Sequence, residues 1–116
     1  MVRYPEVLLV KAEALARQGT AVNGTAVGLV NALRTRAKAA PVNPATKQDL
    51  INAVMRERRI ELASGGHAYL DFQRTLSDLP AHATVPAQPY NSDFRIWPIP
   101  QRDMLIRPTL VQNNNY

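Results

Sequence analysis

TKQDLINAVMRERRIELASGGHAYLDFQR, residues 46–74, is the stretch that decides the fold of this 116-residue chain. Thr46 and Asp49 have the spacing of a capping box, in which each side chain bonds the other residue's backbone N–H at a helix start. Apolar residues then recur at helical spacing, and they are Ile51, Val54, Met55 and Leu62. The Gly65–Gly66 pair predicts the helix end, because glycine adopts the left-handed conformation that closes helices.

Arg58 projects into the middle of that apolar stripe. A buried guanidinium is costly unless carboxylates or carbonyls accept its hydrogen bonds. Glu57 and Glu61, or a neighbouring helix, are candidate partners, so we predict that Arg58 is buried and ion-paired. Ala53 and Ile60 form a second, weaker apolar strip on the opposite side, which predicts that this helix packs between neighbours.

Two further helices are predicted upstream, and the first is apolar on two sides. Pro5 suits its first turn and Gly19 ends it. One of its apolar sides consists of Val7, Val10 and Ala14, and the other of Leu8, Ala12, Leu15 and Ala16. The second helix has a single apolar face made of Ala26, Leu29, Val30, Leu33 and Ala37. The residues of this second helix expected to point to solvent are Asn31, Arg34, Thr35 and Lys38.

The expected fold class is all-α, a tetratricopeptide-like helical array with a long irregular C-terminal tail. Residues 1–74 form the predicted helical scaffold, with helices at about 5–18, 25–39, 46–64 and 67–74. Residues 75–116 are expected to be an irregular loop and tail packed on the helices, because Pro80, Pro86 and Pro89 interrupt any periodicity. Phe94 and Trp97 are the expected anchors of this tail, and a helical turn is expected at 101–106.

The charge distribution argues against a nucleic-acid partner. The net charge of +5 arises within residues 1–74, where eleven basic and six acidic side chains are interleaved. The aromatic residues do not alternate with the basic ones, so a solvated, ion-paired helical surface is favoured over a nucleic-acid interface. The absence of cysteine excludes disulfides and thiolate zinc sites.

Four motifs occur in a characteristic order, namely RYPEVLLVKAEAL, VNALRTRA, ERRIELASGGHAYLDFQR and WPIPQRDMLIRPTLVQNNNY. Together they resemble the C-terminal part of the SusD/RagB family, and they cover nearly the whole chain. The structural motif residues that the resemblance implies are Glu57, Arg58, Arg59, Glu61, Asp71, Arg74, Trp97 and Pro98. The chain departs from the family pattern at Gly65, where a glutamate is usual, and at Ala68, where an arginine is usual.

The resemblance implies a function in nutrient uptake. Family members are cell-surface lipoproteins that bind glycans or other nutrients and act with a TonB-dependent outer-membrane transporter. This chain then looks like the C-terminal part of such a protein, anchored through an N-terminal lipid-bearing segment that it does not include. The helix pattern alone leaves a different function open, that of a tetratricopeptide-like protein–protein interaction module.

Residues for catalysis, metal or cofactor binding are not evident in the sequence. His67 and His82 have only Asp71 and Asp78 near them in sequence, which is a poor metal set. Glu57 and Glu61 are expected to be ion-pair partners rather than an acid–base pair, so neither enzymatic activity nor a cofactor is predicted.

Exposed aromatic rings are the usual platform for sugars, and the weak ligand candidates here are Tyr69 and Tyr90. Ligand contacts in the family mostly come from segments outside this stretch. Because three helices cannot cover every apolar side, the isolated chain is also expected to expose an apolar patch and to form a homodimer.

Overall fold

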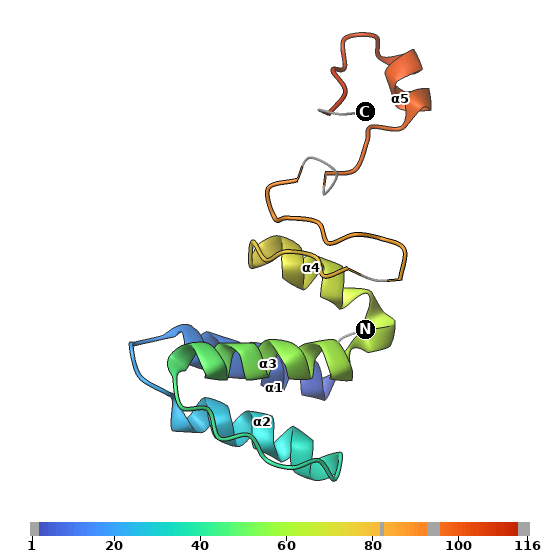
Figure 1. The fold of residues 1–116 in the computed structure, drawn as a ribbon. Coiled ribbons are helices and arrows are strands. Elements are labelled where there is room, and N and C mark those ends of the chain that lie inside the picture. The colour runs from blue at the N-terminus through green and yellow to red at the C-terminus, as the bar shows by residue number, and fades with distance from the viewer. Residues whose placement is uncertain (1–2, 82, 93–95, 114–116) are drawn as a thin grey trace. The chain divides into compact units, whose positions relative to one another are not determined.

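The computed structural model describes residues 3–81, 83–92 and 96–113, and these are largely helical (Figure 1). The helices are α1 (Tyr4–Arg17), α2 (Gly24–Arg36), α3 (Lys47–Glu61), α4 (His67–Arg74) and α5 (Gln101–Ile106), with a short 3-10 turn at Ala63–Gly65. Extended pairing within the described residues amounts to one antiparallel bridge, between Leu79 and Gln88. The predicted all-α class is confirmed.

The chain consists of two units, Met1–Ala68 and Tyr69–Tyr116. The first holds α1, α2 and α3, and the second holds most of α4 together with the tail and α5. The division expected from the sequence lies six residues later, after Arg74. Two residues named in the sequence analysis, His82 and Phe94, lie outside the described residues.

Local signals determine where the helices of the first unit begin and end. The capping box of Thr46 and Asp49 is confirmed, since Thr46 Oγ1 accepts from the Asp49 backbone N–H and the Asp49 carboxylate accepts from that of Thr46. Asn23 caps α2 in a similar way by accepting from the backbone N–H of Ala26. Gly19 follows the end of α1 with a φ of 61°, a left-handed conformation suited to glycine.

The core of the first unit lies where α1 packs against both α2 and α3 (Figure 1). Its buried apolar residues are Leu9, Ala12, Ala16, Ala26, Val30, Leu33, Leu50 and Val54. The predicted face of α2 is confirmed for Ala26, Val30 and Leu33. Leu9 and Leu50 are fully buried, although the sequence analysis assigns neither to an apolar face.

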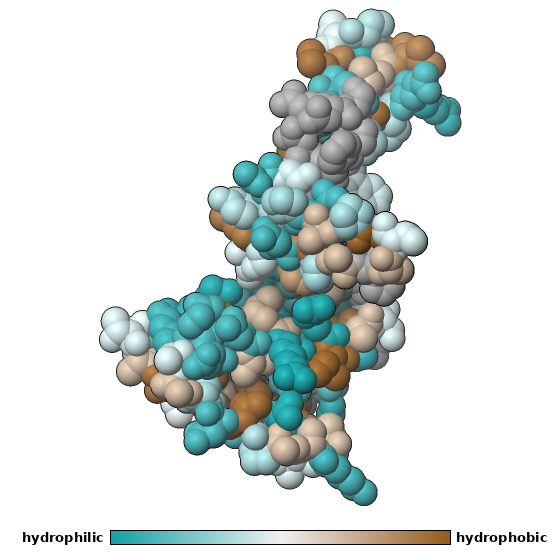
Figure 2. Space-filling model, viewed as in Figure 1, coloured by the Kyte–Doolittle hydropathy of each residue, from teal (hydrophilic) through white to brown (hydrophobic). Residues whose placement is uncertain are grey.

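One predicted apolar side of α1 has no partner within the described residues. Val7 and Val10 are 51% and 53% exposed, and Ile60 on α3 is 59% exposed. The core face of α1 contains Ala12 and Ala16, which belong to the other predicted side, together with Leu9. These residues lie opposite Val7 and Val10 on the helix. The predicted exposure of apolar residues is thus confirmed, and hydrophobic side chains are visible at the surface in Figure 2.

The turn after α3 depends on the backbone of Gly66, whose φ is 70°. We expect Gly66→Ala to lower the free energy of unfolding by roughly 1–2 kcal/mol, because a Cβ is disfavoured in the left-handed region. Gly28 lies inside α2 with open space around its Cα, so Gly28→Ala should raise that free energy by roughly 0.8–1.0 kcal/mol. Urea unfolding of both variants measures their free energies of unfolding. If the two variants were equally stable, the left-handed conformation assigned to Gly66 would be contradicted.

Candidate functional site

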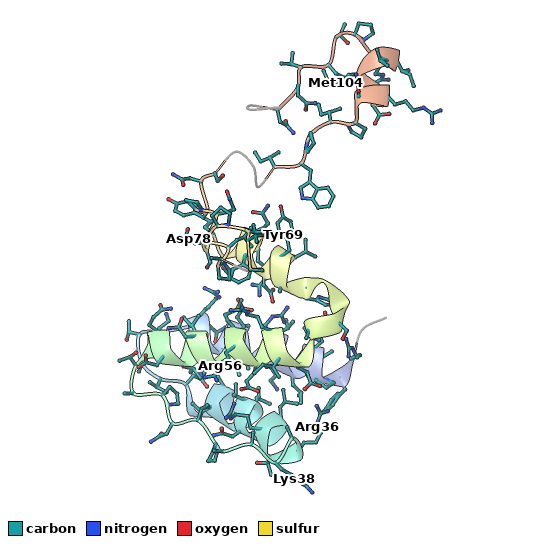
Figure 3. The ribbon with its side chains drawn as sticks, turned by 45° about the vertical axis from the view of Figure 1, so that its right-hand side comes forward. Arg36, Lys38, Arg56, Tyr69, Asp78 and Met104 are labelled. Atoms are coloured by element: carbon teal, nitrogen blue, oxygen red, sulfur yellow. The ribbon has the colours of Figure 1, made fainter. Side chains whose placement is uncertain are left out.

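Two carboxylates of α3 are ion-paired with two arginines of α2. The buried Glu57 pairs with Arg34, and Glu61 Oε1 lies 2.6 Å from Nη2 of Arg36, the last residue of α2, which Figure 3 labels. The partners are 23 and 25 residues apart in sequence, so these pairs hold α3 against α2. Because both carboxylates pair with arginines of another helix, their role is to stabilise the packing of α2 against α3.

Asn31 and Arg34 do not point to solvent, and the sequence prediction for them was wrong. The side-chain amide of Asn31 accepts from the backbone N–H of Val42 at 2.8 Å and donates to the Val42 carbonyl at 3.0 Å. Arg34 Nε also donates to the carbonyl of Ala40. Both side chains are drawn inward because the loop after α2 turns back along the helix, bringing unpaired backbone groups within reach.

Arg58 is buried as predicted, with 5% of its surface exposed. It lies on the same face of α3 as Leu50, Val54 and Leu62, which are also buried. Arg59, the next residue of the motif, and Arg56, which precedes the motif, are exposed. The ERRIEL motif therefore alternates between the core and the surface, and Arg58 is the arginine of this motif that the core encloses. Its predicted ion pair stays a prediction.

In α4, the motif residues Asp71 and Arg74 form an ion pair one helical turn apart. Asp71 is buried, and its Oδ1 accepts from Arg74 Nε at 2.8 Å and lies 2.7 Å from Arg74 Nη2. The Thr75 hydroxyl donates to the backbone carbonyl of Asp71 at 2.7 Å. These contacts close the C-terminal end of α4, which suggests a structural role for this part of the motif.

The C-terminal motif folds back on itself through side-chain amides. Gln112 Oε1 accepts from the backbone N–H of Ile99 at 2.8 Å, and its Nε2 donates to the Ile99 carbonyl at 3.0 Å. Gln112 Nε2 also lies 3.3 Å from the sulfur of Met104, which Figure 3 labels. Asn113 Nδ2 donates to the carbonyl of Trp97 at 2.7 Å. The tail that looked polar and irregular in sequence is therefore bonded to the backbone of the WPIP segment that precedes α5.

Trp97 is held by its backbone and one edge of its ring. Its Nε1 donates to the hydroxyl of Tyr69 at 3.2 Å, and the two rings meet edge-on with centroids 6.5 Å apart and planes at 63°. Tyr69 also accepts from Gln73 Nε2 at 2.7 Å. Trp97 is 76% exposed, and its contacts with Tyr69 connect the tail to α4, as expected of an anchor. The following residue, Pro98, is exposed as well.

The other weak ligand candidate, Tyr90, lies in the loop after α4. It is 53% exposed, and its backbone N–H donates to Asp78 Oδ1 at 2.8 Å. Tyr90 thus belongs to a different segment from Tyr69 and Trp97, and the ring contact between those two does not include it. Across residues 3–81, 83–92 and 96–113, no group of three or more acidic or histidine side chains is placed to hold a metal ion.

These contacts belong to motifs that a family model also matches. A model of the SusD family matches this chain over residues 1–116. The chain belongs to the SusD family. It is similar to the SusD-like protein P38 of Formosa agariphila, with 32% identity over 123 aligned positions that cover 98% of this chain and 24% of that protein.

Solved structures of SusD superfamily proteins share the fold. One from Parabacteroides distasonis aligns over the whole chain with a TM-score of 0.83 at 24% identity. Another from Bacteroides vulgatus aligns over 99% of this chain with a TM-score of 0.72 at 27% identity. The chain covers 27% of each of these proteins, so it spans about a quarter of the length of its relatives. No helix in the described part of the chain is long and apolar enough to cross a membrane.

The ring of His67 lies close to Gly65 in this SusD family chain. A Cβ built on Gly65 would lie 2.6 Å from the His67 ring carbon Cδ2, which is too close for van der Waals contact. His67 Nδ1 in turn lies 3.9 Å from Glu6 Oε1. A side chain at position 65 would therefore require the His67 ring to move.

Sequence reasoning missed the residues that act through side-chain amides. Asn31, Gln112 and Asn113 were not singled out as site residues, although each lies inside one of the four motifs. The available signal was their position in the motifs, since an amide that bonds a distant backbone leaves no periodicity in the sequence. The motif residues that were singled out cluster on α3 and α4, apart from Trp97 and Pro98.

Proposed function

We propose that this chain is the C-terminal part of a SusD-like protein that binds a glycan or another nutrient at the cell surface. The whole protein would act with a TonB-dependent transporter and be anchored in the outer membrane by an N-terminal lipid. The observation that carries the proposal is the match of the family model to all 116 residues. Membership in a family of binding proteins also supports a role without catalysis.

The contacts in the two units support this proposal because they involve the motifs that the chain shares with the family. Arg34 and Arg36 of the second motif pair with Glu57 and Glu61 of the third. Gln112 of the fourth motif closes the tail on Ile99. Since the motifs are used for packing, this chain would provide a scaffold, and most ligand contacts would come from the rest of the protein.

The test begins with the complete coding region that contains this chain. We expect it to encode a signal peptide followed by a lipid-accepting cysteine, and a TonB-dependent transporter beside it. The complete protein should bind at least one member of an oligosaccharide panel in calorimetry, and it should co-purify with the transporter from detergent-solubilised outer membranes. A complete protein without a signal peptide, and without binding to any sugar, would contradict the proposal.

A second function, a tetratricopeptide-like protein interaction module, is favoured by one observation. Val7 and Val10 leave an apolar strip of α1 in solvent, and Ile60 does the same on α3. Apolar patches on isolated soluble proteins commonly mark surfaces that bind protein. Capture of a specific protein by the complete polypeptide, with no sugar binding, would favour this function over nutrient uptake.

The same strip leads to a prediction about the isolated chain. We expect it to self-associate, with a two-fold dimer as the simplest closed arrangement, because association removes the apolar strip from water. Light scattering over a dilution series measures the mass, and Val7→Ser with Val10→Ser should shift the dimer toward monomer. A monomer at high micromolar concentration, unchanged by these substitutions, would contradict the prediction.

A further inference from the structure

We propose that Trp97, positioned by Tyr69, forms a stacking platform for one ring of a neutral pyranose sugar. The proposal rests on the proposed function and names a ligand-binding residue in this part of the chain. Both residues belong to the second unit, and Tyr69 lies on α4, where Figure 3 labels it. Three properties support the proposal, namely the exposure of the indole ring, the way it is held and the uncharged groups that contact it.

The indole ring is held at its edge, which leaves its flat surface open to solvent. Trp97 is 76% exposed although its Nε1 donates to the Tyr69 hydroxyl. Because the ring planes of the pair meet at 63°, Tyr69 contacts an edge of the indole and does not stack on its face. The polar atom of the indole thus has a partner within the protein, while the electron-rich face remains available to a ligand.

The backbone that carries this ring is restrained on its C-terminal side. Asn113 Nδ2 bonds the carbonyl of Trp97, and Gln112 bonds both backbone polar groups of Ile99. Pro98 and Pro100 restrict the backbone of the residues that precede them. A platform that is already positioned loses less conformational entropy when a ligand binds, so even a single stacking contact can be detected.

The chemistry around Trp97 fits an uncharged sugar. The face of an aromatic ring is partially negative, and it attracts the weakly positive C–H groups that a pyranose presents on one side. The side chains that the structure places against Trp97 are uncharged, since its Nε1 bonds the Tyr69 hydroxyl, which in turn accepts from the neutral amide of Gln73. A β-linked glucose oligomer presents such a C–H face on every ring, and we therefore choose cellohexaose as the probe.

Trp97 is the single tryptophan of the chain, so intrinsic tryptophan fluorescence reports on this site alone. Titration of the 116-residue chain with cellohexaose should change the emission saturably, with a dissociation constant in the millimolar range. Sorbitol, an acyclic polyol without a ring face, should produce no saturable change at the same concentration of hydroxyl groups. An emission that does not respond to cellohexaose, or responds equally to sorbitol, would overturn the proposal.

Variants test whether the ring is the binding element. In saturation-transfer NMR, Trp97→Ala should lose the signal that cellohexaose receives from the protein, and Tyr69→Phe should weaken it because the indole loses its hydrogen-bond partner. Tyr4→Ala is the matched control, since Tyr4 is 74% exposed but belongs to the other unit. Retention of the full signal in Trp97→Ala, checked as folded by circular dichroism, would refute the site.

The outcome for this site can be separated from that for the proposed function. If the complete protein binds an oligosaccharide and the Trp97→Ala change leaves its affinity unaltered, the platform is refuted while the function stands. If the complete protein binds no sugar and the chain shows no fluorescence response, both fail. A saturable response that Trp97→Ala removes supports the platform, whichever sugar the complete protein prefers.

Discussion

Replacing Arg58 by alanine is expected to lower the free energy of unfolding of the first unit by about 3–5 kcal/mol, which is the range for removing one partner of a buried ion pair. Arg58 is 5% exposed and shares its face of α3 with Val54 and Leu62. Truncation removes the packed methylene groups of the side chain together with the predicted ion pair, whose acidic partner would then lack its counter-charge. Urea unfolding followed by circular dichroism in the far ultraviolet measures the change.

Arg56→Ala is the matched control, because Arg56 lies in the same helix, two residues before Arg58, but is exposed. Figure 3 labels Arg56. This variant should unfold within about 0.5 kcal/mol of the parent, as surface substitutions usually do. Arg58→Met keeps most of the apolar volume, so it should lose less stability than Arg58→Ala if packing contributes much of the effect. Equal stability of Arg58→Ala and the parent would show that the guanidinium has no role in the core.

Leu9→Ala is expected to destabilise the first unit by about 2–5 kcal/mol, the range for removing most of a buried leucine. Leu9 is fully buried on the side of α1 that faces the core. The loss combines the transfer free energy of the missing methyl and methylene groups with the cost of the cavity between packed helices. Thermal and urea unfolding should both show the lower stability.

The neighbouring residue provides the control for this prediction. Val10 is 53% exposed, so Val10→Ala should change the free energy of unfolding by well under about 1 kcal/mol in the monomer. The comparison is made at low protein concentration, where self-association through Val7 and Val10 does not contribute. If Val10→Ala were as destabilising as Leu9→Ala, the orientation of α1 in the structure would be wrong.

The sequence alone was sufficient for the features that depend on residues a few positions apart. The capping box at Thr46 and the glycine after α1, Gly19, have the predicted roles. They were predictable because a cap or a helix end is decided by backbone groups within one turn of the signal. The predicted end of α3 at Gly65–Gly66 was wrong, since α3 ends at Glu61 and the left-handed Gly66 closes the 3-10 turn that follows. The burial of Arg58 was also predictable, since a narrow apolar stripe on α3 leaves little choice of face. The four motifs likewise indicated the family, because each is a continuous run of residues that is recognisable without any tertiary contact.

The candidate site was only partly predictable. The sequence makes Tyr69 a weak ligand candidate, and it predicts that Trp97 is an anchor of the tail. The edge-on contact between them joins residues 28 positions apart, and it leaves the indole ring in solvent. No local pattern encodes such a contact, because exposure depends on what the fold places against the ring.

Only the tertiary structure decided which face of α1 enters the core and which distant groups pair. Because α1 is apolar on several sides, periodicity could not choose between Leu8 and Leu9, and the packing of α2 and α3 selects Leu9. Lys47, at the start of α3, donates to the carbonyl of Arg17, 30 residues earlier, where α1 ends and its last carbonyls have no partner within the helix. Contacts of this kind follow from the geometry of packed helices, since side chains far apart in sequence meet only after the chain has folded.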